Sequence, residues 1–167
     1  MYGAGDAKVA RIMGLPVITK TDRRGNRYET SPEGKKIKEL FLERLGLKEL
    51  IEECKEEQAN GRVSLVDGSY VICPSPHAAL NYKLQGSGAR VMALSSVLAD
   101  REVQRNNWDA LKVGDIHDED QSDCDPPIAN DFGKMRVETI VESGRLLKLD
   151  VPLGGEYKIG KTWARTH

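Results

Sequence analysis

No stretch of this sequence is apolar for long enough to cross a membrane, and its first residues lack the basic and apolar blocks of a signal peptide. These absences predict a cytoplasmic protein with no membrane partner. Aromatic residues make up only 5% of the chain, so any core must depend mainly on aliphatic side chains. The 167 residues contain no internal repeat and no low-complexity segment, and they suffice for one ordinary domain with a real core.

Cysteine is scarce, and its spacing is uninformative. Cys54, Cys73 and Cys124 lie far apart and form no CxxC pair, which predicts free thiols in a reducing compartment. The net charge is only −1, but it is unevenly distributed. Residues 1–50 carry eleven Lys and Arg against seven Asp and Glu, whereas residues 101–167 carry ten against thirteen. The overall charge therefore neither supports nor excludes a nucleic-acid partner.

Helix and strand signals are mixed along the chain and predict an α/β (α+β) fold. Ser31-Pro32 is a helix-start signal, and the apolar face that follows ends at Gly46, after which a second short helix continues to about residue 60. Asp67-Gly68 lies between two β-prone runs and predicts a hairpin. The other expected elements are an exposed basic loop over 17–31, a long helix over 75–103, a final helix over 129–144 with Phe132, Met135, Val137, Ile140 and Val141 on its apolar side, and a strand after it.

The long helix carries two different stripes. Apolar residues at helical spacing face a core, and Gly88 among them would let a neighbouring backbone come close. His77, Asn81 and Gln85 recur every four residues, so they would project in line from another face. A polar stripe is ordinarily a solvated face, but such faces are normally rich in Lys and Glu. A stripe of Asn, Gln and His differs from such a charged solvated face.

The most acidic stretch is 114–125, where six acidic residues fall between 115 and 125 without a Lys or Arg. Such a run repels itself unless a positive charge lies in it. One interpretation is a solvated acidic loop, and another is a calcium-type turn, although the stretch lacks the glycine and closing glutamate of an EF-hand loop. A third is a tight β-hairpin with His117 and Asp118 at its tip. The carboxylates of Asp118 and Glu119 would then project at the turn, where they could hold a divalent cation.

Four blocks occur in one order along the chain: MYGAGD at 1–6, SPHAALNYKLQGSGA at 75–89, IHDEDQ at 116–121 and YKIGKTWARTH at 157–167. In order and spacing they resemble the C-terminal part of family A DNA polymerases, the bacterial polymerase I type, and most closely the phage replicative branch. The resemblance spans nearly the whole chain and is weakest over 17–31 and 101–113.

The resemblance implies a partial right-hand polymerase fold in two parts. Residues 1–60 correspond to the end of motif B and the remaining fingers helices. Residues 61–167 correspond to the palm, with a minor-groove helix at 75–103 and a catalytic hairpin, which carries motif C, at 111–124. The implied activity is that of a DNA-directed DNA polymerase acting on primer-template DNA and dNTPs, in the host cytoplasm if a phage encodes it.

The resemblance also implies roles for single residues. Asp118 and Glu119 match the catalytic carboxylates of motif C, and Asp118 would bind Mg²⁺ in a two-metal site shared with an aspartate of motif A. A His at the C-terminus, here His167, also occurs in the phage branch. The positions implied to contact DNA are Tyr2, Gly3, His77, Asn81, Gln85 and His117.

Two departures from the family pattern accompany the match. Asp115 and Asp120 stand where the family usually has apolar strand residues, which weakens the strands and adds charge. Motif A and the triphosphate-binding residues of motif B are absent, because the sequence starts at the end of motif B. We therefore expect a split gene or a truncation, with the N-terminal polymerase fragment supplied as a second chain. Without it we expect no activity, an open sheet edge and exposed apolar surface.

Two other classes of protein stay open as alternatives. One is a non-catalytic DNA-binding or interaction module derived from a polymerase palm, which Asp115 and Asp120 favour. The other is an unrelated α/β protein with an acidic metal-binding turn.

Overall fold

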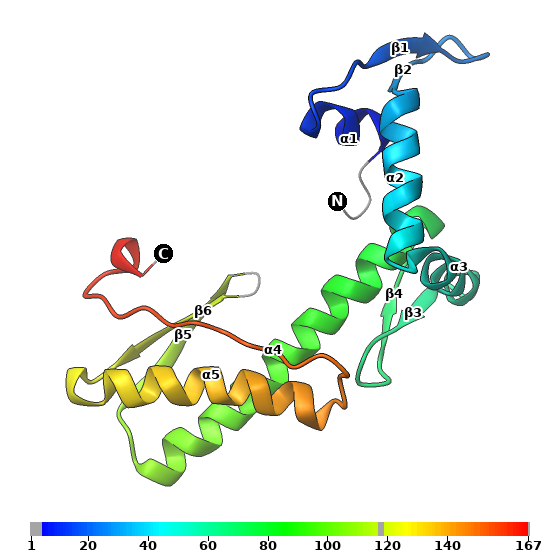
Figure 1. Ribbon diagram of the computed structural model, residues 1–167. Helices are drawn as coiled ribbons and strands as arrows, with labels where there is room; N and C mark the ends of the chain where they lie inside the picture. Colours follow the sequence, from blue (N-terminus) through cyan, green and yellow to red (C-terminus); the bar gives the residue numbers. More distant parts are fainter. Residues whose placement is uncertain (1–4, 117–118, 167) are drawn as a thin grey trace. The chain divides into compact units, whose positions relative to one another are not determined.

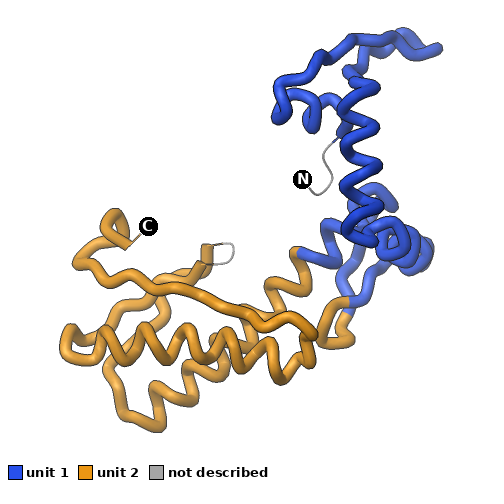
Figure 2. Tube along the Cα trace, viewed as in Figure 1, with its two compact units in different colours: residues 1–64, 70–84 blue, residues 65–69, 85–167 orange. Residues whose placement is uncertain are grey.

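The computed structural model describes residues 5–116 and 119–166. Helices alternate there with three two-stranded antiparallel sheets, which confirms the expected mixed fold class (Figure 1). The chain forms two compact units, residues 1–64 with 70–84 and residues 65–69 with 85–167 (Figure 2). None of the helices in the described ranges is long and apolar enough to cross a membrane. The assignment of 1–60 to fingers and 61–167 to palm stays a prediction, because these units are defined by contacts alone.

Unit 1 begins its helices where the sequence signals predict. The Ser31 hydroxyl accepts a hydrogen bond from the backbone N–H of Gly34 at 3.2 Å and caps the helix that starts at Pro32. Gly46, at φ 62°, then separates two consecutive helices. The elements of this unit are α1 (Asp6–Ile12), β1 (Ile18–Thr21), β2 (Arg27–Thr30), α2 (Pro32–Arg44), α3 (Leu47–Gln58), β3 (Arg62–Ser64), β4 (Tyr70–Ile72) and the 3₁₀ turn η1 (Pro76–Ala78).

Two small cores hold unit 1 together. In one, Val9 and Ala10 of α1 are buried where this helix crosses α2 at Gly34. The other is built from Cys54, Val63, Cys73 and Ala79, with partly buried aliphatic residues around them. All three cysteines of the chain are free, as predicted, and burial raises the pKa of the Cys54 thiol.

Unit 2 contains the predicted motif C hairpin and the two helices that pack beside it. Its core is formed by Ala99, Phe132 and Met135, with Trp108 and Cys124 packed against them. Its elements are the later part of α4 (Ala79–Asn106), β5 (Ala110–Ile116), β6 (Glu119–Cys124), the 3₁₀ turn η2 (Pro126–Ile128), α5 (Ala129–Leu146) and the 3₁₀ turn η3 (Trp163–Arg165).

The turn at 65–69 docks on α4 inside unit 2. Leu65 packs where Gly86 leaves room for it, and the Ser87 hydroxyl accepts a hydrogen bond from the Val66 backbone N–H at 3.2 Å. Asp67 pairs with Arg90 at 2.6 Å, and hydrogen bonds from Ser69 and Arg90 lower the pKa of Asp67 to about 2. The predicted hairpin around Asp67-Gly68 is confirmed by the antiparallel pairing of β3 with β4.

Four expectations about the fold are wrong. Residues 17–31 contain the β1–β2 hairpin instead of a loop. The long helix starts at Ala79 instead of 75, because Pro76–Ala78 form a 3₁₀ turn. Gly88 has open space around it, and Gly86 is the glycine of α4 that a neighbour approaches. No strand follows α5 in the described residues; that segment is irregular up to η3.

Replacing a helical glycine with alanine should have opposite effects on stability at Gly34 and at Gly88. A Cβ on Gly34 would lie 2.2 Å from the backbone oxygen of Asp6, so Gly34→Ala must push α1 and α2 apart. We expect this to lower the free energy of unfolding by about 1–3 kcal/mol. Gly88→Ala meets nothing within 4 Å, so it should raise that free energy by about 0.5–1 kcal/mol, because alanine is the better helix former. Urea unfolding of both variants tests the crossing, and equal effects of the two would contradict it.

Candidate functional site

The acidic stretch is a β-hairpin, so the solvated-loop interpretation is wrong. β5 and β6 pair antiparallel from Ala110 opposite Cys124 to Ile116 opposite Glu119. A register shift between Lys112 and Gly114 marks a bulge in β5. Glu119 is thus the first residue of β6. The expected tip residues His117 and Asp118 lie outside the described residues, and their roles stay predictions.

The register of this hairpin places two like charges face to face. Asp115 pairs directly opposite Asp120, an arrangement that destabilises a sheet unless the charges are compensated. The Lys112 ammonium donates to both carboxylate oxygens of Asp115 at 2.9 Å and also reaches the Ser96 hydroxyl of α4 at 3.0 Å. Arg136 of α5 forms an ion pair with Asp120. Lys112 therefore compensates the charge of Asp115, and Arg136 compensates that of Asp120.

The two ion pairs differ strongly in burial. The side chains of Lys112 and Asp115 are 36% and 60% exposed, so this pair contributes little to stability. The side chains of Arg136 and Asp120 are only 9% and 15% exposed. In such a pair each charge depends on the other, because removing one partner leaves the second buried and uncompensated.

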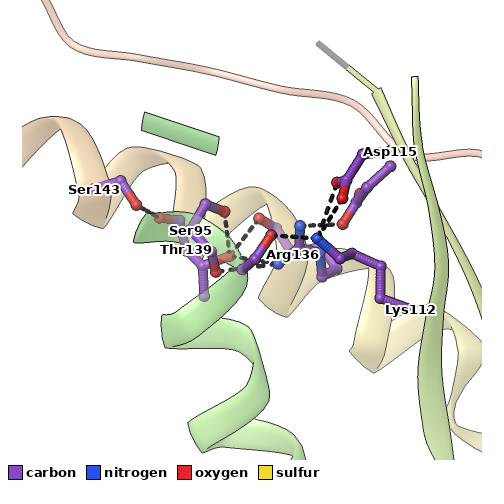
Figure 3. Close-up of polar contacts among 8 residues, drawn as sticks. Ser95, Lys112, Asp115, Arg136, Thr139 and Ser143 are labelled. Atoms are coloured by element: carbon purple, nitrogen blue, oxygen red, sulfur yellow. Dashed lines mark hydrogen bonds and ion pairs between the residues drawn. The ribbon is translucent and has the colours of Figure 1, made fainter. Parts of the chain in front are cut away.

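A buried polar network extends from Arg136 between α4 and α5 (Figure 3). The Nη1 of Arg136 donates to the backbone oxygen of Ser95 at 3.2 Å, whereas its Nε has no hydrogen-bond partner among the described residues. The hydroxyls of Ser95 and Thr139 are hydrogen-bonded at 3.0 Å, and Ser143 donates to the Thr139 backbone oxygen at 2.7 Å. These bonds satisfy polar groups that burial would otherwise penalise, and they tie the two helices together.

Arg136 was missed in the sequence, although a signal for it exists. It falls in the buried stripe of α5 between Phe132 and Thr139, at the spacing of one helical turn. A charged residue inside such a stripe predicts a buried partner. The expected apolar side of this helix is confirmed for Phe132 and Met135 but wrong for Val141, which is 44% exposed.

The C-terminal segment packs along α5 and reaches the start of β6. The ring of Tyr157 occupies the space beside Gly133, and Leu153 occupies the space beside Gly144. Further along, the Thr166 hydroxyl donates to Oε1 of Gln121 at 3.2 Å, while Nε2 of Gln121 donates to the carboxylate of Glu119. The segment is thereby linked to the predicted catalytic carboxylate, and Figure 1 shows it running beside α5.

Within unit 2, two of the predicted site residues border the same open hollow. Gln85 of α4 and Glu119 of β6 both line it, together with Arg136 and with Lys161 and Arg165 of the C-terminal segment. Basic and acidic side chains thus line the same hollow.

The other predicted DNA contacts lie elsewhere or outside the described residues. Asn81 and Gln85 are four residues apart on the continuous helix α4, so they share one of its faces. His77 is exposed in η1, before this helix begins. None of these three side chains makes a hydrogen bond within the described part of the chain, so all three are available to a ligand. Tyr2, Gly3 and His167 are outside that part.

The described residues do not form a metal site by themselves. No group of three or more His, Cys, Asp or Glu side chains is arranged to hold an ion within residues 5–116 and 119–166. Asp115 and Asp120 are engaged by Lys112 and Arg136, so they are poor candidates for ligands. The predicted metal ligand Asp118 lies outside the described residues, so its role stays a prediction.

The fold is similar to that of a solved DNA polymerase domain. It is similar to the POL domain of Pol1 from M. smegmatis, solved in complex with DNA primer-template and dNTP, with a TM-score of 0.66 and 17% sequence identity. The match covers 85% of this chain and 25% of that chain. This confirms the expected partial polymerase fold.

The sequence relatives are DNA polymerases, and no protein-family model matches the chain. It is 29% identical over 177 residues to a DNA-directed DNA polymerase of Escherichia phage Phieco32, covering 99% of this chain and 26% of the relative. It is 27% identical over 194 residues to that of Escherichia phage T7, covering 100% and 25%. A match to DNA polymerase I of Aquifex aeolicus is 29% identical and covers 52% and 15%. The resemblance to polymerase I-type enzymes is confirmed, and the chain spans about a quarter of the length of these phage relatives.

Replacing Arg136 tests the buried pair. Arg136→Met leaves the carboxylate of Asp120 buried without its cation, so we expect the free energy of unfolding to fall by about 3 kcal/mol. The matched control is Arg145→Met on the same helix, whose ion pair with Glu142 is exposed and should contribute less than about 1 kcal/mol. The double variant Asp120→Leu/Arg136→Met should recover most of the loss in urea unfolding. Equal effects of the two single variants would contradict the burial argument.

Proposed function

We propose that this chain is the C-terminal part of a DNA-directed DNA polymerase and that a second chain carrying motif A completes its active site. One observation carries the proposal: the two strands that flank positions 117 and 118 are paired, and Glu119, the first residue of β6, lines the same hollow as Gln85. Similarity to phage DNA polymerases over the whole chain supports it.

In this proposal the chain contributes carboxylates to nucleotidyl transfer. Asp118 holds catalytic Mg²⁺ together with the motif A aspartate, and Glu119 is the neighbouring carboxylate. When bound, a pair of such ions lowers the pKa of the primer hydroxyl and stabilises the charge that develops on the transferred phosphate. The hard oxygen ligands of carboxylates are those that Mg²⁺ prefers.

The cations beside the hairpin keep the neighbouring acids out of that site. Asp120 is turned to Arg136 and Asp115 to Lys112, so their charges are compensated within the chain. This arrangement supports a metal site in which Asp115 and Asp120 take no part. In this proposal the catalytic carboxylates of the hairpin are Asp118 and Glu119.

The polar residues of η1 and α4 suit a check of base-pair shape without reading of sequence. In the minor groove, adenine N3 and thymine O2 present acceptors at similar places in both orientations of the pair. Asn81 and Gln85 donate through their side-chain amides, and a mispair would displace the acceptors that they meet. In this proposal His77 is a further minor-groove contact, and His117 contacts the primer end.

Features of the hairpin favour a second chain. β5 and β6 form a sheet of only two strands, which is marginal in water without further support. Leu111 and Val113 of β5 are 69% and 62% exposed. An apolar, half-paired strand of this kind is the expected contact for a partner that supplies further palm structure.

The alternative function is that of a non-catalytic DNA-binding or interaction module. It is favoured by the incomplete metal donor set among the described residues. Such a module would bind primer-template DNA but would not need Asp118.

Primer extension by a reconstituted assembly tests the proposal. The chain is co-expressed with an N-terminal polymerase fragment containing motif A from the same genome, and synthesis is measured in Mg²⁺. We expect the isolated chain to be inactive, the assembly to be active, and Asp118→Ala to abolish synthesis while primer-template affinity changes less than about twofold, because affinity comes mainly from phosphate contacts. The matched control is Asp150→Ala, which removes an exposed carboxylate without an ion pair in the described part of the chain.

Two outcomes would contradict the proposal. Template-dependent synthesis by the isolated chain would exclude the need for a second chain. Equal synthesis by wild type and Asp118→Ala assemblies would exclude the metal assignment and favour the non-catalytic module.

A further inference from the structure

The β1–β2 hairpin lies in a part of the chain that the polymerase resemblance covers least. Every residue from 18 to 29 is exposed, on both faces of the hairpin. The two strands pair in register from Ile18 opposite Thr30 to Thr21 opposite Arg27. Figure 1 shows the hairpin next to α1 and α2, which belong to the same unit. A hairpin that is this exposed contributes little to a core, so its sequence is free to serve another purpose.

The turn of this hairpin is held by hydrogen bonds to the side chain of Asp22. The carboxylate of Asp22 accepts hydrogen bonds from the backbone N–H groups of Arg24 at 2.8 Å and Asn26 at 2.9 Å. The bond from Asn26 is the main reason that the pKa of Asp22 lies below its usual value. Gly25, at φ 83°, supplies the left-handed conformation that the turn requires. Arg23 and Arg24 are both exposed within this hydrogen-bonded turn.

The charges of the hairpin are unbalanced once its internal contacts are counted. Both of its acidic residues are occupied: Asp22 caps the turn, and Glu29 pairs with Arg11 of α1 at 2.5 Å. Its basic residues make no ion pair within the described residues. These unpaired cations are Lys20, Arg23, Arg24 and Arg27.

An aromatic side chain accompanies these cations. Lys20 is directly opposite Tyr28, so the two side chains share one face of the hairpin, and Tyr28 is 49% exposed. Phosphate groups are bound by arginine forks and lysine ammonium groups, and an exposed aromatic ring adds a stacking surface for an unpaired base. Basic side chains interleaved with an aromatic one are typical of sequence-independent nucleic-acid contacts.

We infer that the β1–β2 hairpin is a nucleic-acid-binding arm, which holds the phosphodiester backbone of DNA through Lys20, Arg23, Arg24 and Arg27 without reading its bases. The inference rests on the proposed function only in that it takes DNA as the polyanion. It adds a binding surface outside the residues that carry the polymerase resemblance. An acidic protein segment is the competing partner, and the experiment separates the two.

The salt dependence of DNA binding tests this inference on the 167-residue chain. Affinity for a fluorescent primer-template with a single-stranded template overhang is measured by anisotropy over a series of salt concentrations. The hairpin variant is Arg23→Gln/Arg24→Gln/Arg27→Gln. The control variant is Lys36→Gln/Lys38→Gln/Arg44→Gln, which removes three cations of α2 that also lack an ion pair in the described part of the chain.

We expect the hairpin variant to lose about two units of the slope of log affinity against log salt, because each lost phosphate contact removes roughly 0.7–0.9 of a unit. The control should lose less than about one unit. The charge-preserving variant Arg23→Lys/Arg24→Lys/Arg27→Lys should keep the wild-type slope. Poly-glutamate, at equal charge concentration, should compete far less well than unlabelled DNA.

Three results would overturn the inference. These are the absence of measurable DNA binding by the chain, equal losses in the hairpin and control variants, and displacement by poly-glutamate as effective as by DNA. The last result would assign the hairpin to an acidic protein. Since none of these measurements requires synthesis, failure of primer extension in the assembly would overturn the polymerase function and leave the inference about the arm standing.

Discussion

The buried ion pair between Arg136 and Asp120 constrains the rest of unit 2. A pair of this kind need not add net stability compared with two apolar side chains, but neither charge tolerates the loss of the other. It therefore specifies an arrangement. A slip of one residue in the pairing of β6 would turn Asp120 to the opposite face of the hairpin and leave Arg136 buried alone. Hydrogen bonds within the group formed by Ser95, Thr139 and Arg136 connect α4 to α5. Through Arg136, this group also fixes the position of β6 against the two helices.

This constraint also explains how so acidic a hairpin folds. Asp115 and Asp120 would repel each other across the strands, and each is compensated by a different element: Asp115 by Lys112 in its own strand and Asp120 by Arg136 in α5. Side chains of this chain thus compensate both carboxylates. Under the proposed function, Asp118 and Glu119 act in catalysis, and the partner chain contributes further carboxylates.

The sequence predicted the local elements well, because their signals are local. Ser31-Pro32, Gly46 and Asp67-Gly68 mark ends and turns through their own backbone preferences, and the structure confirms each. The β1–β2 hairpin was mistaken for a loop because it has no buried face, so its strands show no apolar alternation. Its turn depends on the side chain of Asp22, which accepts hydrogen bonds from the backbone of Arg24 and Asn26. The composition of the segment does not reveal these bonds.

The site was harder to predict than the elements. The blocks of sequence indicate Asp118, Glu119 and Gln85, and the structure brings Glu119 and Gln85 to one hollow. The partner of Asp120 lies 16 residues away in α5, and pairing over such a distance is decided by tertiary packing. The irregular segment after α5 escaped prediction for the same reason: Tyr157 and Leu153 are placed by gaps at Gly133 and Gly144 rather than by strand pairing.

The most direct test of the account is the position of bound Mn²⁺ in crystals of the two-chain assembly with primer-template and a non-reactive dNTP analogue. Anomalous scattering locates the ion independently of its ligands. The account predicts an anomalous peak at the carboxylate of Asp118, with Asp120 still paired to Arg136 and Asp115 to Lys112. A peak ligated by Asp115 or Asp120, with Lys112 or Arg136 released, would contradict it.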